Sequence, residues 1–317
     1  MIRKIQFLII YIFKYYFGFN TKSRILVLNY HGLVEQITNE RLQRNFHTIP
    51  QFKKHIEILK KEKFIFLNAD QFVFYHQNLI KKKRLVFLIF DDGYKNNLKA
   101  IEILKTQNIP CTFFLSTQSI DTKHSIWTVN LSLLLLEGNL NEIIYKKKYY
   151  SIKNSFEKSS FFNLVRNELK FCSLEHRTKV ICDFINQYPE NELERLFEKH
   201  NYFKMLTWND IKKVQTNNIQ FHSHGHSQEI HYENQCIELM TNEIELSKQI
   251  IEDNLKKSVY LFAFPNGNYF KTSESILEKY GYKNAFVLEG INNNLGKFRI
   301  QRIIPNSKIY KFKNQIL

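Results

Sequence analysis

The segment Leu85-Val86-Phe87-Leu88-Ile89-Phe90-Asp91-Asp92-Gly93-Tyr94 joins an apolar run to two carboxylates and a glycine. The run that ends at Phe90 has the length and the Val, Ile and Phe content of a buried parallel strand. Side chains alternate along a strand, so Asp91 and Asp92 take different roles unless the chain turns there, which Gly93 permits. One carboxylate can then bind a metal while the other accepts a proton. The plainer interpretation is an acidic turn after a core strand, and Asp-Asp-Gly alone does not exclude it.

The segments on either side alternate between strand and helix patterns. Upstream, residues 24–32 form an apolar run that ends in His31-Gly32, residues 46–59 carry apolar residues at helical spacing, and residues 64–67 resemble a short strand. Downstream, a helical pattern leads to a second buried strand at residues 110–116. This alternation predicts an α/β fold with parallel strands.

From about residue 128 to about residue 205 the alternation stops. Residues 155–200 are rich in Lys, Glu and Asn, and their apolar residues are spaced three and four apart. That spacing is typical of helices. We predict a helical insertion that interrupts the α/β fold and contains no motif with obvious chemistry.

Histidines cluster where the alternation resumes. Residues 219–226 read Ile-Gln-Phe-His-Ser-His-Gly-His and alternate as a strand does. His222, His224 and His226 have a period of two, so they would face one side of an extended chain. Together with Asp92 they offer the nitrogen and oxygen ligands of a zinc-type site that keeps an open position for water.

The unusual residues share a position relative to the predicted strands. The C-terminal ends of strands carry His31, the Asp91-Asp92 pair, the histidine cluster, Pro265 and Arg302. In a (β/α) barrel these ends lie on one face, and that face holds the active site. We therefore predict a (β/α) barrel, distorted and seven-stranded, that spans residues 24–317 and carries the helical insertion.

Composition limits the classes of partner. The chain has 317 residues, and 46 Lys and Arg against 30 Asp and Glu give a formal net charge of +16. This charge favours anionic membrane surfaces, acidic polymers or nucleic acid. No RNA-binding signature or aromatic-basic repeat is present, so nucleic acid is not expected. The four cysteines lack Cys-x-x-Cys spacing, so we expect reduced residues rather than a disulfide or zinc framework.

Residues 1–23 form a candidate membrane-associated segment. The apolar run from Ile5 to Phe13 is shorter than the roughly 20 residues that a membrane span needs. Basic residues flank it, as in an amphipathic helix that lies in the membrane interface. A helix packed on the barrel is the alternative, and a signal peptide is disfavoured because no small-residue cleavage site follows.

Four segments together resemble the polysaccharide deacetylase family, which includes chitin-oligosaccharide and peptidoglycan N-deacetylases. Ile89-Phe90-Asp91-Asp92-Gly93 is similar to its first motif, and Phe262-Ala263-Phe264-Pro265-Asn266-Gly267 resembles one branch of its third. Leu28-Asn29-Tyr30-His31 resembles the opening strand of members from surface-polysaccharide gene clusters, and Arg302-Ile303 resembles their closing strand. The resemblance runs from about residue 24 to about residue 305.

The second motif of the family, His-Ser/Thr-x-x-His, has two possible registers here. His222 to His226 matches it residue for residue, and this is the register that we favour. Aligning by the strand instead makes His224 the first ligand and places Gln228 at the position of the second. A further departure is Ala263, where other branches have an arginine. Arg302 is predicted to reach the same acidic group from its own strand.

The resemblance implies metal-assisted amide hydrolysis. Asp92, His222 and His226 would hold a divalent metal, expected to be zinc, which lowers the pKa of water from about 15.7 toward about 7 and polarises the acetyl carbonyl. Asp91 would take the proton from water, with Arg302 beside it. A backbone N–H of Gly93 or Tyr94 would stabilise the oxyanion, next to Pro265 in the substrate site. The proton donor to the leaving amine is open between His31 and the unused histidine of the cluster.

The expected substrate is an N-acetylated amino sugar in a cell-surface polysaccharide or its precursor. The basic surface and the N-terminal segment would suit work beside an anionic bilayer. Two alternatives remain: a deformylase or amidase that acts on a small or lipid-linked sugar, and an inactive barrel that only binds glycan. Gln228 and Ala263 make the second alternative credible.

Overall fold

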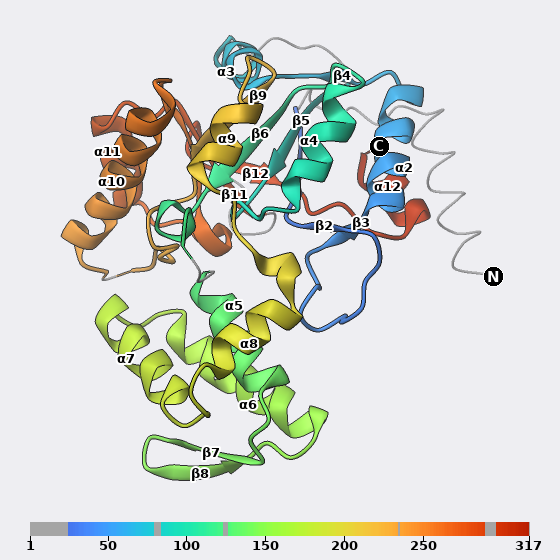
Figure 1. Cartoon of the computed structure of the whole chain (residues 1–317). Helices are drawn as coiled ribbons and strands as arrows, with labels where there is room; N and C mark the ends of the chain where they lie inside the picture. Colours follow the sequence, from blue (N-terminus) through green and yellow to red (C-terminus); the bar gives the residue numbers. More distant parts are fainter. Residues whose placement is uncertain (1–24, 79–83, 123–125, 234, 289–295, 317) are drawn as a thin grey trace.

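The computed structural model describes residues 25–78, 84–122, 126–233, 235–288 and 296–316. Its centre is a parallel sheet that curves into a nearly closed barrel with helices around it (Figure 1). Seven strands follow one another in space: β1 (Leu26–Tyr30), β5 (Leu85–Phe90), β6 (Cys111–Leu115), β9 (Ile219–Ser223), β10 (Leu261–Ala263), β11 (Asn284–Leu288) and β12 (Ile300–Arg302). The short β4 (Ile65–Phe66) pairs with the start of β5. The predicted distorted seven-stranded barrel is confirmed.

The barrel closes through the residue after β12. Ile303 accepts a hydrogen bond from the N–H of Asn29 at 2.8 Å and donates one to the carbonyl oxygen of Val27 at 2.9 Å. This parallel bridge joins the last strand to the first. Asn29, His31 and Arg302 are thereby held at neighbouring strand ends.

The two faces of the strands bury different sets of residues. Alternate residues such as Val27, Phe87, Phe114 and Phe286 form one apolar cluster inside the barrel. The intervening residues pack outward in a larger cluster with the surrounding helices. These helices are α2 (Ile49–Lys61), α4 (Asn97–Lys105), α9 (Trp208–Val214), α10 (Ile237–Leu255), α11 (Thr272–Lys279) and α12 (Ile309–Ile316). Because of the alternation, Asn29, Asp91 and Arg302 lie on the inner face near its C-terminal end.

Helix α3 (Ala69–Gln77) closes the N-terminal end of the barrel. Its Phe72 stacks on Phe87 with ring centroids 4.4 Å apart. Its first residue, Ala69, donates its backbone N–H to the side chain of Gln220 at 2.8 Å, and Asp70 accepts from the Tyr260 hydroxyl at 2.5 Å. In Figure 1 this helix lies at the top of the view, and the opposite end of the barrel points down toward the insertion.

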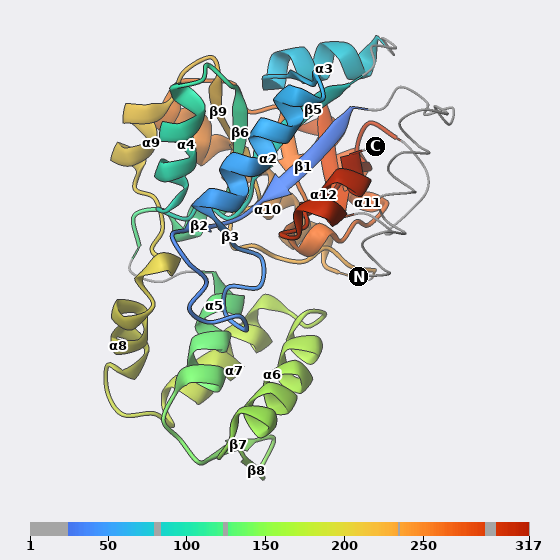
Figure 2. The same cartoon turned by 90° about the vertical axis from the view of Figure 1, so that its right-hand side faces the viewer.

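Between η1 (Thr117–Ser119) and α9 lies a body with a core of its own, drawn below the barrel in Figures 1 and 2. It contains a two-stranded hairpin besides the expected helices. Its elements are α5 (Trp127–Ser132), the π-helical η2 (Leu133–Glu137), β7 (Glu142–Tyr145), β8 (Lys148–Ser151), α6 (Ser155–Leu169), α7 (Leu174–Ile185), α8 (Glu192–Lys199) and η3 (Asn201–Phe203).

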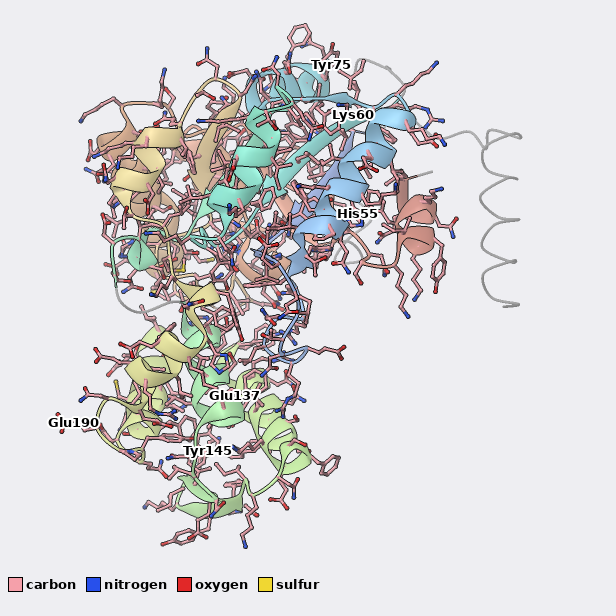
Figure 3. The ribbon with its side chains drawn as sticks, turned by 45° about the vertical axis from the view of Figure 1, so that its right-hand side comes forward. His55, Lys60, Tyr75, Glu137, Tyr145 and Glu190 are labelled. Carbon is pink, nitrogen blue, oxygen red and sulfur yellow. The ribbon has the colours of Figure 1, made fainter. Side chains whose placement is uncertain are left out.

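A loop at residues 35–46 connects the barrel to the insertion. It lies between β2 (Leu33–Val34) and β3 (His47–Thr48) and descends toward α5 in Figure 2. Glu137, labelled in Figure 3, accepts a hydrogen bond from Asn39 at 2.8 Å and pairs with Arg41 at 3.8 Å. The loop is thus fastened to the insertion over the C-terminal ends of the barrel strands.

The expected amphipathic helix at residues 1–23 lies outside the described residues. None of the described helices is both long enough and apolar enough to cross a bilayer.

Candidate active site

A pocket opens at the C-terminal ends of the strands, between the barrel and the insertion. The barrel contributes the ends of β1, β5 and β12 and the segment after β9, and the insertion contributes α5 and α6. Its polar lining includes Asn29, His31, Asp91, Asp92, His224, Gln228, Arg302 and Asn266. Pro265, at the start of η4 (Pro265–Gly267), also lines it. Residues that are more than 200 positions apart in the sequence therefore meet at one site.

Asp91 is buried and surrounded by donors on one of its two oxygens. Its Oδ2 accepts hydrogen bonds from Arg302 Nη1 at 2.5 Å and from Asn29 Nδ2 at 2.9 Å, and His31 Nε2 lies 3.8 Å away. Arg302 is itself fixed by a bond from Nη2 to the carbonyl oxygen of Phe264 at 2.6 Å. The other oxygen, Oδ1, is buried without a hydrogen-bond partner among the described residues. This arrangement keeps one oxygen oriented and leaves the other able to accept a proton.

Asp92 turns away from Asp91 because the backbone leaves the strand at this residue. Its φ is +72°, in the left-handed region. Gln228 Nε2 donates to its Oδ1 at 2.6 Å, and His224 Nε2 lies 3.5 Å from the same oxygen. Burial alone raises the pKa of Asp92, but the neighbouring imidazoles of His224 and His31 outweigh it, so the pKa lies below its usual value. Asp92 is therefore expected to carry a negative charge at neutral pH.

His224 is oriented by the neighbouring strand. Its Nδ1 lies 2.7 Å from the carbonyl oxygen of Ala263, which can only accept a hydrogen bond. Nδ1 therefore carries the proton, and in the neutral ring the lone pair of Nε2 faces Asp92. A carbonyl that fixes one ring nitrogen while the other faces a carboxylate is the usual support of a metal-binding histidine.

The structure does not bring His222 or His226 to Asp92. His222 lies deeper inside the barrel, where its Nδ1 accepts the N–H of Tyr260 at 3.4 Å and burial lowers its pKa to about 3. His226 Nδ1 lies 2.9 Å from the hydroxyl of Thr117, and neither histidine lines the pocket. The register with His222 and His226 as ligands, which the sequence analysis favoured, is thus unsupported by these positions. The geometry favours its alternative, with His224 and Gln228 beside Asp92.

The donor set fits a divalent cation, with one unusual member. The described residues contain no group of three His, Cys, Asp or Glu side chains suited to a metal. Asp92 and His224 nevertheless present facing acceptor atoms. Gln228 Oε1 is buried without a hydrogen-bond partner among the described residues, so a turned amide would add a third oxygen. Amide oxygens are ligands of hard cations more than of zinc.

The other predicted site residues differ in how well their positions fit the expected roles. Tyr94 and Pro265 line the pocket with His31. The N–H of Gly93 donates to the carbonyl oxygen of Asp91 at 2.9 Å, so it is already used, and Tyr94 is the better candidate for an oxyanion donor. Burial, followed by the charge of Asp92, raises the pKa of the Tyr94 hydroxyl well above its usual value. This hydroxyl therefore stays protonated, and it helps to keep the pKa of Asp92 below its usual value.

Two features of the site were not predicted from the sequence. Asn29 was assigned no role, although a polar residue two positions before His31 on a buried strand faces the same side. Arg44, Arg166 and Lys170, which line the pocket, were also assigned none. No local motif marks these three, because they come together only through the placement of the insertion.

Comparison with known proteins agrees with this architecture. The family model described as polysaccharide deacetylase matches residues 79–154 and 161–285. The chain belongs to the polysaccharide deacetylase family. No curated relative matches the sequence.

Solved structures of deacetylases have the same fold. The Streptococcus pyogenes deacetylase PplD in complex with acetate is 17% identical, with a TM-score of 0.59 over 93% of this chain and 99% of that chain. IcaB from Ammonifex degensii is 14% identical, with a TM-score of 0.59 over 93% and 97%. A de-N-acetylase from Aggregatibacter actinomycetemcomitans is 15% identical, with a TM-score of 0.56 over 93% and 100%. At these identities the likeness concerns the fold.

Proposed function

We propose that this chain removes N-acetyl groups from amino sugars of a cell-surface polysaccharide or its precursor. The observation that carries the proposal is the division of labour between two adjacent carboxylates. Asp91 is held by Arg302 and Asn29 with one oxygen left free, whereas Asp92 faces the lone pair of His224. Family membership supports carbohydrate deacetylation as the reaction.

Each side chain has a separate part in this proposal. Asp91 accepts the proton of the attacking water, while Arg302 orients its carboxylate. The N–H of Tyr94 donates to the developing oxyanion. His31, within 3.8 Å of Asp91, is the candidate donor of a proton to the leaving amine.

Asp92, His224 and Gln228 would hold a divalent cation. When bound, such a cation lowers the pKa of water and polarises the acetyl carbonyl. Zinc is the expected cation of the family resemblance, and manganese or cobalt would suit a site with an amide ligand at least as well.

The test combines turnover with metal content. Purified full-length protein is supplied with zinc, manganese or cobalt, and acetate release is measured on N-acetylated chito-oligosaccharides. Elemental analysis then compares the native chain with His224→Ala and His222→Ala. We expect about one metal per chain, lost in His224→Ala and retained in His222→Ala. The opposite pattern would restore the register that includes His222.

A second candidate is an inactive barrel that binds glycan. The hydrogen bond from Gln228 to Asp92 favours this candidate, because the bond occupies the carboxylate oxygen that a metal would need. Glycan binding without metal uptake or acetate release, with all three cations supplied, would support this candidate and refute the hydrolase.

We also propose that the chain works at an anionic membrane surface. The net charge of +16 and the basic, apolar residues 1–23 support this. Co-sedimentation with vesicles that contain phosphatidylglycerol should fall with added salt and with deletion of residues 1–23. Equal sedimentation with neutral phosphatidylcholine vesicles would refute it.

A further inference from the structure

Three cationic side chains line the wall of the pocket that holds Asp91 and Asp92. Arg44 comes from the loop between β2 and β3, while Arg166 and Lys170 are one helical turn apart, on α6 and at its C-terminal end. Burial, followed by their mutual repulsion, lowers the pKa of Arg44 and Lys170. All three side chains line the same pocket, so their charges act on the same space.

No acidic side chain among the described residues pairs with any of the three. Other cations of the same region are paired: Arg41 with Glu137, Lys146 with Glu168, and Arg177 with Glu229. Like charges one helical turn apart destabilise a helix by a few tenths of a kcal/mol. Among the described residues, no acidic side chain offsets this repulsion.

Arg166 is the central member of the cluster. Its guanidinium lies over the ring of Phe162, 5.4 Å from the ring centre, and Phe162 also lines the pocket. Its Nε is buried without a hydrogen-bond partner among the described residues. A planar guanidinium with free donors is suited to a carboxylate or a phosphate, which it binds through two parallel hydrogen bonds.

We propose that Arg44, Arg166 and Lys170 form a subsite for an anionic group of the substrate. The amino sugar whose acetyl group reaches Asp91 then belongs to an acidic glycan, whose carboxylate or phosphate lies against α6. This inference rests on the proposed function, and it makes the insertion the part of the chain that selects the substrate. The barrel supplies the chemistry, and the insertion recognises the charge.

Three small probes test the subsite. N,N′-diacetylchitobiose is neutral, a disaccharide of glucuronate and N-acetylglucosamine carries a carboxylate, and N-acetylglucosamine 1-phosphate carries a phosphate. Binding to the full-length chain is measured by calorimetry at low and high salt. We expect at least one anionic probe to bind about tenfold to a hundredfold tighter than the neutral one, as charge-assisted hydrogen bonds predict. The anionic probe that binds more tightly than the neutral one identifies the anion as carboxylate or phosphate.

Arg166→Gln and Lys170→Gln should each remove most of this preference, measured as the ratio of anionic-probe affinity to neutral-probe affinity. Lys105→Gln is the matched control, because Lys105 is exposed on α4 outside the pocket. Thermal unfolding confirms that each variant is folded. Equal binding of all three probes to the native chain would overturn the subsite, as would a preference that survives both substitutions. Acetate release is measured separately, so a chain that binds anionic probes but releases no acetate would refute only the deacetylase.

Discussion

At the level of single residues, the two adjacent aspartates have different surroundings and should respond differently to the same substitution. Asp91→Asn keeps the shape of the side chain but removes the base, so we expect turnover to fall by about 10²- to 10⁴-fold, the usual contribution of a general base. Metal content should be unchanged, because Asp92 and His224 are untouched. Acetate release and elemental analysis on the same preparation test both statements. Loss of metal from Asp91→Asn would exchange the roles of the two aspartates.

Gln228 should limit the affinity of the site for zinc. Its amide donates to Asp92 Oδ1 at 2.6 Å, and an imidazole at this position would offer a nitrogen ligand instead. We expect Gln228→His to bind zinc at least tenfold more tightly than the native chain, measured by competition with a chelator. Gln228→Asn serves as the control, since it keeps the amide but shortens the side chain. Unchanged zinc affinity in Gln228→His would place residue 228 outside the metal site.

The residues of the site could be predicted only in part. His31, Asp91, Asp92 and Arg302 stand out because each follows an apolar strand, and strand ends meet at one face of a barrel. The histidine register could not be settled from spacing. His222 and His224 have the same alternation along the strand, so spacing does not show which of them lies beside Asp92. In the structure it is His224, whose Nδ1 lies against the carbonyl oxygen of Ala263 at the end of β10.

At the level of elements, a buried ion pair fastens α7 of the insertion to the segment that carries His224 and Gln228. Arg177 and Glu229 form this pair, and both are almost completely buried. Removing one partner of such a pair leaves an uncompensated charge and costs about 3–5 kcal/mol of the free energy of unfolding. We expect Arg177→Met to lose that amount in urea denaturation.

The double variant Arg177→Met, Glu229→Gln is the control for this pair. It removes the stranded charge and should recover part of the lost stability. Recovery stays incomplete because Arg177 Nε also donates to the carbonyl oxygen of Leu169 at 2.9 Å. A double variant that is no more stable than Arg177→Met would show that the loss comes from packing rather than from the charge of Glu229.

The hairpin of β7 and β8 shows why one element escaped prediction. Its turn consists of Lys146 and Lys147, both with positive φ, at +51° and +62°. Such two-residue turns normally contain Asn-Gly or Asp-Gly, and this turn has neither. Helix α2 was easier to predict, because apolar residues recur at helical spacing over residues 46–59.

The same turn gives a prediction about stability. Lys147→Gly should stabilise the chain by about 1 kcal/mol, because glycine adopts positive φ without the steric cost of a side chain. Lys148→Gly is the matched control. Lys148 lies in β8, where glycine costs about 0.5–1 kcal/mol, so this variant should be less stable than the native chain. If the two substitutions changed the unfolding temperature equally, residue 147 would not have the positive φ on which this prediction rests.

At the level of the whole molecule, the cation site would connect strands that are not neighbours. Asp92 follows β5 and His224 follows β9, and β6 lies between these strands in the sheet. A cation held by both therefore joins two sides of the barrel, and because the unfolded chain lacks this arrangement, binding stabilises the folded state. A free cation concentration of about 100 times Kd would add about 2.7 kcal/mol to the free energy of unfolding.

We therefore expect the unfolding temperature to rise with added cation and to fall with chelator. For a chain of this length a gain of that size corresponds to roughly 4 °C. Asp92→Asn should abolish the response, because it removes one ligand charge, whereas His222→Ala should keep it even if the variant starts from a lower unfolding temperature. This second behaviour separates the metal site from packing, since His222 is buried below the site and contacts Tyr260 rather than Asp92. If none of the cations supplied changes the unfolding temperature, the inactive glycan-binding barrel is the better account of the molecule.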